Sequence, residues 1–133
     1  MNHHENIKTF VRDTLGCGCP EEVFHYIDCQ SDIKLNDMVL RSKLNIGNRL
    51  LIYIVEVDDQ DSLKNILPFL IEIGKKERDG LGFNRFRLVL ATNTVNETKE
   101  VAEAVFKDTA KDEKVHLHLV LKESIPNFLK PCP

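Results

Sequence analysis

The sequence predicts a single α/β domain with a mixed sheet of about five strands and an N-terminal helix. The chain, 1–133, holds no internal repeat, low-complexity tract or linker, so we expect one core. A chain of this length buries roughly two thirds of its unfolded surface without disulfide staples. From residue 49 onward, strand-like and helix-like segments alternate, which predicts a β-hairpin followed by two right-handed βαβ crossovers.

The first two elements come from the N-terminal third of the chain. Ile7, Phe10, Val11 and Leu15 recur at helical spacing, and Gly16 follows where a left-handed helix cap is favoured. These residues predict a helix over 5–15. The segment "VFHYIDC" is rich in aromatic and β-branched residues, so we expect a first strand near 24–29. The alternative is that "PEEVF" continues as a helical turn.

The hairpin is predicted from two apolar runs around the turn "NIGN". The runs cover 38–44 and 49–57, and Gly47 can adopt the positive φ that short hairpin loops require. A helix over 61–78 follows, with Asp61 as its N-cap and Pro68 as an expected kink or a delayed start.

The last three predicted elements are a strand over 85–92, a helix over 94–110 and a strand over 114–121. Thr94 and Glu97 have the spacing of a capping box, which marks the start of the helix. Alternation places one set of apolar residues on the sheet face that the crossover helices should cover. That set is Phe86, Leu88, Leu90, Leu117, Leu119 and Leu121.

Composition and charge exclude several classes of protein. The longest apolar run, "LLIYIV", is far shorter than the ~20 residues that span a bilayer, so no membrane partner is expected. A net charge of −3 makes nucleic-acid binding an unfavoured function. The start "MNHHENIK" lacks the features of a signal peptide, so we expect a cytoplasmic protein whose cysteines are thiols or ligands.

The stretch "TLGCGCPEEVF" carries the most pointed chemical signal. Pro20 and two glutamates have the composition of a first helical turn, which makes Cys19 its N-cap, where backbone N–H groups stabilise a thiolate. Cys17 lies one residue away as a second thiol. This pair favours a thiol redox function, with Cys19 as the reactive residue and Cys17 as its partner.

Metal binding is a second interpretation of the same turn. Two thiolates supply half of a tetrahedral zinc or iron–sulfur site, and Cys29, Cys132 and His25 are the further candidate ligands. Paired C-x-x-C knuckles are absent, however. A third interpretation is purely structural, because free cysteines often pack as small apolar residues in a turn. All three stay open at this level.

A divalent-cation site is another hypothesis. Glu56, Asp58 and Asp59 follow a predicted parallel strand, at the edge where open α/β sheets bind ligands. The element order also resembles the core of restriction-endonuclease-like folds, whose third core strand carries an acid-x-lysine motif. At the matching place this chain has Glu56-Val57-Asp58, without the lysine. Fold resemblance alone implies no activity.

The second functional lead is a polar face of the sheet. Alternation directs Arg85, Arg87, His116 and His118 away from the crossover helices, and we call these four residues the Arg/His strip. Arginine binds carboxylate or phosphate in bidentate fashion, and histidine titrates near neutrality. We also place the apolar residues Tyr53, Val55, Val89 and Val120 on this face, which favours a homodimer or a protein partner there. The face could be covered by solvent, by the N-terminal helix or by a partner.

Two functional classes follow from these leads. One is a small cytoplasmic accessory protein that uses the Cys-x-Cys turn for thiol redox or for metal or cluster binding. The alternative is a non-catalytic module that dimerises or binds an anion or partner through the Arg/His strip. No nucleophile motif places serine, histidine and aspartate together, so the sequence assigns neither catalytic residues nor a reaction.

Overall fold

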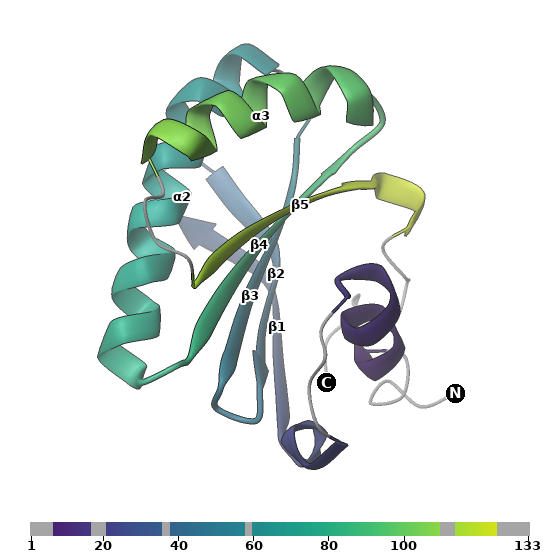
Figure 1. Cartoon of the computed structure of the whole chain (residues 1–133), viewed down its shortest axis with the longest axis vertical. Helices are drawn as coiled ribbons and strands as arrows, with labels where there is room; N and C mark the ends of the chain where they lie inside the picture. The colour runs from purple at the N-terminus through teal and green to yellow at the C-terminus, as the bar shows by residue number, and fades with distance from the viewer. Residues whose placement is uncertain (1–6, 17–20, 36–37, 58–59, 110–113, 125–133) are drawn as a thin grey trace.

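The computed structural model describes residues 7–16, 21–35, 38–57, 60–109 and 114–124. It confirms an α/β fold with one mixed five-stranded sheet in the sequential order β1-β2-β3-β4-β5. The first three strands form an antiparallel meander, and β3, β4 and β5 run parallel. Helices α2 and α3 lie on one side of the sheet and the N-terminal helical segment on the other (Figure 1).

The N-terminal segment is helical from residue 7 and becomes a π-helix, η1 (Phe10–Thr14). Leu15 N–H donates to the Phe10 carbonyl, and Gly16 then adopts a φ of 67°, which confirms the expected left-handed cap. A short 3-10 helix, η2 (Glu21–His25), follows. Arg12 ties the two segments together through an ion pair with Glu21 at 3.0 Å.

Strand β1 (Ile27–Leu35) begins later than the sequence predicted. Phe24, the expected first residue of the strand, is buried in η2 together with Val23, so "PEEVF" takes the alternative of a helical turn. The Phe24 ring packs beneath the Arg12 guanidinium, 5.1 Å from the ring centroid. Docking of these two apolar side chains against the N-terminal segment therefore prevails over their strand propensity.

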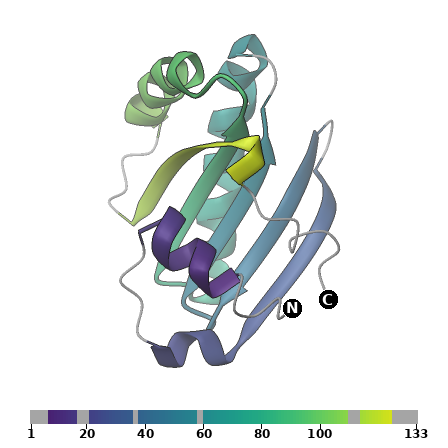
Figure 2. The ribbon, with the colours of Figure 1, turned by 90° about the vertical axis from the view of Figure 1, so that its right-hand side faces the viewer.

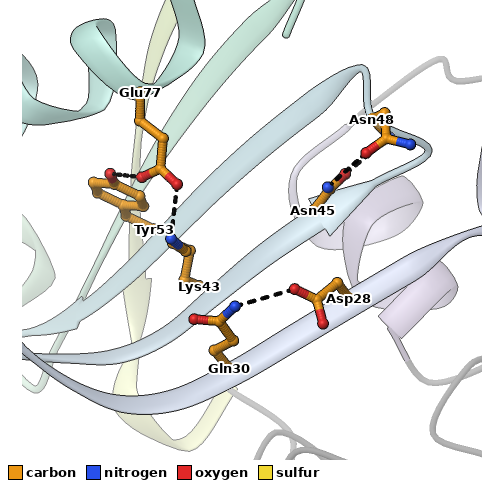
Figure 3. Close-up of polar contacts among 7 residues, drawn as sticks. All are labelled: Asp28, Gln30, Lys43, Asn45, Asn48, Tyr53 and Glu77. Atoms are coloured by element: carbon orange, nitrogen blue, oxygen red, sulfur yellow. Dashed lines mark hydrogen bonds and ion pairs between the residues drawn. The ribbon is translucent and has the colours of Figure 1, made fainter. Parts of the chain in front are cut away.

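The predicted hairpin is confirmed as β2 (Met38–Ile46) and β3 (Leu50–Glu56). Gly47 and Asn48 both have positive φ, 62° and 58°, as a tight hairpin turn requires. Asn45 accepts from the Asn48 backbone N–H at 2.8 Å and donates to its side chain at 2.9 Å (Figure 3). Gly47 N–H also bonds the Tyr26 carbonyl at 2.7 Å, so the turn is held against the start of β1.

The crossovers follow the predicted order. They comprise α2 (Gln60–Leu81), β4 (Arg85–Thr92), α3 (Val95–Thr109) and β5 (Val115–Leu121), and β5 leads into a short turn, η3 (Lys122–Ser124). Helix α2 runs through Pro68 without ending there. Pro68 removes the hydrogen bond to the carbonyl of Lys64, which is exposed, so water can replace that bond. Leu67 and Leu70, on either side of the proline, are buried in the core and hold the helix in place.

The sheet separates two apolar cores. The first packs Leu63, Leu67, Leu70 and Ala102 of the helices against Phe86, Leu88 and Leu90, with Leu117 and Leu119 partly buried beside them. This confirms that both crossover helices cover the face predicted for them. The second core packs Ile7, Phe10, Val11 and Leu15 against Ile52, Ile54 and Val89 on the opposite face. Figure 2 shows the N-terminal segment lying across that face.

Two residues assigned to the Arg/His face were placed wrongly from the sequence. In the parallel register, Ile52 pairs with Arg87 and Tyr53 pairs with Leu88. Tyr53 and Val55 therefore belong to the core beneath α2 and α3, whereas Ile52 and Ile54 share the face with the arginines. Paired residues share a face, so a shift of one residue reverses every assignment.

A partly buried polar contact anchors α2 to the sheet. Glu77 of α2 accepts from the Tyr53 hydroxyl and, at 2.7 Å, from the Lys43 ammonium group (Figure 3). The Tyr53 ring lies edge-on to Phe86 with their centroids 4.8 Å apart. Burial, followed by the hydrogen bond to Glu77, raises the pKa of Tyr53, so its hydroxyl stays protonated and continues to donate.

Candidate functional site

The structure brings the four residues of the Arg/His strip together at the β4/β5 end of the sheet. Arg85 Nη1 lies 3.3 Å from His116 Nε2, and Arg87 Nη1 lies 2.8 Å from His118 Nε2. Because a guanidinium can only donate, each histidine accepts at Nε2 and carries its proton on Nδ1. The strip is therefore two consecutive Arg-to-His hydrogen bonds.

The parallel register explains why the two contacts repeat. Arg87 pairs with His116 across the ladder, and Val89 pairs with His118. Each arginine therefore reaches past its direct neighbour to the histidine one step further along β5. The period-two alternation of both strands repeats this diagonal contact, so guanidinium and imidazole groups alternate along the edge of the sheet.

The N-terminal segment covers one end of the strip. Arg87 Nη1 also donates to the Leu15 carbonyl at 3.1 Å, and Leu15 lies at the end of the π-helical turn. Val89 is buried beneath the same segment, whereas Arg85 remains exposed. We expected this face to be exposed to solvent, covered by the N-terminal helix or buried in a partner, and the structure shows the N-terminal helix. The strip remains open toward the β5 edge.

The strip is electropositive and lacks an acidic partner among the described residues. Burial and then the nearby Arg87 lower the pKa of His118 to about 4. Burial, followed by repulsion from Arg87 and Arg85, also lowers the pKa of His116. Burial, followed by repulsion from Arg85, lowers the pKa of Arg87, whose buried Nε has no hydrogen-bond partner in the described structure.

A groove of about 270 Å³ continues from the strip along β5, and we call it the β5 groove. Its floor is formed by four consecutive β5 residues, 117–120, which include His118. Thr14 of η1 lies on one side, and Val95, Lys99 and Glu103 of α3 lie on the other. The groove therefore joins a strand edge, one histidine of the strip and two oppositely charged side chains.

The structure tests the cysteine hypothesis only at Cys29 and His25. Cys17, Cys19 and Cys132 lie outside the described residues. Cys29 is a buried residue of β1 and is disulfide-bonded, so the expectation of a free thiol or a ligand is not met at this position. His25 is exposed at the end of η2, whereas the Cys29 side chain is in the core beneath the N-terminal segment.

The cation hypothesis gains no support from the described part of the chain. The Glu56 carboxylate is paired with the Arg41 guanidinium at 2.5 Å, and Asp58 and Asp59 lie outside the described residues. Across the described ranges, no group of three histidine, cysteine, aspartate or glutamate side chains is arranged to hold a metal ion.

Comparison of the chain with protein-family models, with curated proteins and with solved structures finds no match in any of the three. None of the helices described is both long and apolar enough to cross a membrane.

Three polar groove residues were missed by sequence reasoning. Lys99 and Glu103 are four residues apart on one face of α3, a spacing that is typical of a solvated helix face. Thr14 is far from both in sequence and comes beside them only because the N-terminal segment crosses the sheet. No sequence signal links η1 to α3, so the groove could not have been predicted.

Proposed function

We propose that this chain is a non-catalytic binding module that holds an oxyanion, a carboxylate or phosphate group of its partner, on the Arg/His strip. The observation that carries the proposal is the alternation of two arginines and two histidines without an acidic partner among the described residues. Structural arginines are normally paired with carboxylates, so an uncompensated pair beside an open strand edge favours an incoming anion.

The strip has donors suited to such a group. Arg85 is exposed and presents a planar fork of N–H groups, which matches the two oxygens of a carboxylate or phosphate. Arg87 is already oriented by the Leu15 carbonyl and His118, so its remaining donors are preorganised.

Replacing Arg85 with glutamine is expected to weaken binding of inorganic phosphate about tenfold or more, since hydrogen bonds to charged groups contribute ~1.5–3 kcal/mol. The measurement is a phosphate titration at pH 7 and low ionic strength, followed by the histidine ring ¹⁵N resonances. The exposed Arg85 carries little packing, so the variant should keep the wild-type unfolding transition.

Lys64→Gln is the matched control, because it removes one positive charge from α2 on the opposite side of the sheet. It should bind phosphate like the wild type. Equal loss in both variants would mean a general charge effect and would contradict a site at the strip. The same conclusion follows if the wild-type His116 and His118 resonances do not respond to phosphate.

A second candidate function uses the cysteines, and the disulfide at Cys29 is the observation that favours it. In the cytoplasm, which we propose as the compartment, glutathione keeps most thiols reduced, so a disulfide there is typically transient and catalytic or redox-sensing. We therefore propose that the Cys-x-Cys turn exchanges disulfides, with Cys19 as the attacking thiolate and Cys17 as its partner. Zinc or iron–sulfur binding by the same turn is the competing proposal.

Alkylation after anaerobic purification and mild reduction should modify Cys19 faster than Cys17, because the sequence predicts the N-cap position, where backbone N–H groups stabilise a thiolate, for Cys19 and not for Cys17. Mass spectrometry of each cysteine measures the rates, and Cys19→Ser is the control that assigns the fast site. Stoichiometric zinc or iron in the purified protein would instead support the ligand role. A metal-free protein in which Cys19 reacts no faster than a model thiol would leave the turn purely structural.

A further inference from the structure

Strand β5 is an edge strand of the sheet. The strand order places β1 and β5 at the two ends of the sheet, and within the described residues no strand pairs with the outer side of β5. Figure 1 looks onto this edge, with β5 in front of β4 and with α3 and η1 on either side. An edge strand presents unpaired backbone N–H and C=O groups, which form a template for another strand.

The two edges differ in how they are protected. Strand β1 carries Asp28 and Lys34, and charged side chains of this kind discourage pairing with another chain. Strand β5 has the sequence "VHLHLVL", with no lysine, acid or proline, and Leu121 is 39% exposed at its end. The β5 edge therefore has the composition of a strand that pairs.

The β5 groove indicates which partner fits. Lys99 and Glu103 are exposed on α3, four residues apart, beside the central residues of β5. The described structure gives neither side chain an ion-pair partner. A two-fold axis beside the middle of β5 would bring Lys99 of one copy opposite Glu103 of the other, and Glu103 opposite Lys99.

We propose that two copies of this chain associate through antiparallel pairing of their β5 strands, which joins the sheets into one and forms two reciprocal Lys99–Glu103 ion pairs. A second copy fits this edge better than an unrelated peptide, because one two-fold operation satisfies the strand edge and both charges together. The dimer is independent of the proposed anion binding and could form without it.

The Arg/His strip does not oppose this arrangement at neutral pH. His118 would face its own copy near the axis. The charged and titratable groups around it are Arg87 from β4, His116 from β5 and Lys99 and Glu103 from α3, with the uncharged Thr14 from η1. The lowered pKa of His118 leaves both rings neutral at pH 7. The two Arg87 residues would be three strand spacings apart, about 14 Å, which exceeds the screening length in physiological salt.

Sedimentation equilibrium under reducing conditions tests the proposal, because a reductant removes any dimer that depends on intermolecular disulfides. The wild type should show a mass about twice the chain mass of 15.3 kDa. Lys99→Glu and Glu103→Lys should each raise the dimer Kd about tenfold, because each converts two attractive pairs into two repulsive ones. The double variant should regain wild-type association.

Mixing the two single variants gives the sharpest result. In a heterodimer of Lys99→Glu with Glu103→Lys, both reciprocal contacts are again between opposite charges, so the mixture should dimerise more tightly than either variant alone. Lys64→Glu on α2 is the control and should not change the dimer. A wild type that stays monomeric to about millimolar concentration, or a dimer that neither single variant weakens, overturns the proposal.

Discussion

Replacing Gly74 with alanine is expected to lower the free energy of unfolding by about 2–3 kcal/mol, the upper part of the range for an overpacked core. Gly74 lies within α2 on the side that faces the sheet. A methyl group built there would lie 2.2 Å from Cε2 and Cζ of the Phe86 ring. Atoms of a real side chain do not approach so closely, so the ring or the helix must move.

The sign of this effect is opposite to the usual one. Alanine is favoured over glycine in a helix by about 1 kcal/mol, so the substitution would stabilise an open position. The Phe86 ring is fully buried and packs edge-on against Tyr53, whose hydroxyl is held by Glu77. Movement of the ring therefore disturbs the polar contact that anchors α2 as well as the packing.

Gly80→Ala is the matched control in the same helix. A methyl group at Gly80 would meet no atom within 4 Å, so this variant should be unchanged or more stable by up to about 1 kcal/mol. Urea unfolding of both variants measures the difference. Phe86→Leu should restore part of the loss in the Gly74→Ala background, and equal behaviour of the two glycine variants would contradict the proposed clash.

Periodicity was sufficient to predict most of the elements and the polar strip. The boundaries of β4 agree with the prediction, because "RFRLVLAT" begins with an alternation of arginine and apolar residues, continues as an apolar run, and follows the turn residues "GLGFN". The same alternation in "VHLHLVL" placed His116 and His118 beside the arginines. These residues are near neighbours on adjacent strands, so local patterns on each strand were enough to bring them together.

Register and long-range cover could not be predicted in the same way. Tyr53 and Val55 were assigned to the wrong face because nothing in β3 alone shows which of its residues pairs with Arg87. Both faces of β3 are buried, so it lacks the polar alternation that would fix its orientation. The β5 groove is lined by η1 and α3, which are about 80 residues apart in the sequence, beyond any local pattern.

Acidification is expected to destabilise the fold through His118, by about 2 kcal/mol between pH 6.5 and pH 4. The pKa of His118 is about 4 in the folded protein and 6.5 without the fold, so between these values only the unfolded chain binds the proton. Stability is therefore complete above pH 6.5 and is lost as the pH falls toward 4. The difference between the two pKa values corresponds to about 3.4 kcal/mol. Because the ring is partly exposed, solvent screening reduces this figure to the expected loss of about 2 kcal/mol.

His118→Gln isolates this contribution, because glutamine keeps an acceptor for Arg87 but does not titrate. At pH 7 the variant should be close to the wild type, and its free energy of unfolding should fall less steeply from pH 6.5 to 4. Urea unfolding at half-unit pH steps gives the difference curve, in which carboxylates elsewhere cancel. His25→Gln, on the exposed η2, is the matched control and should follow the wild type. A difference curve that is flat across this interval would show that protonation of His118 is not opposed by its burial beside Arg87, and the electropositive character assigned to the Arg/His strip would then be wrong.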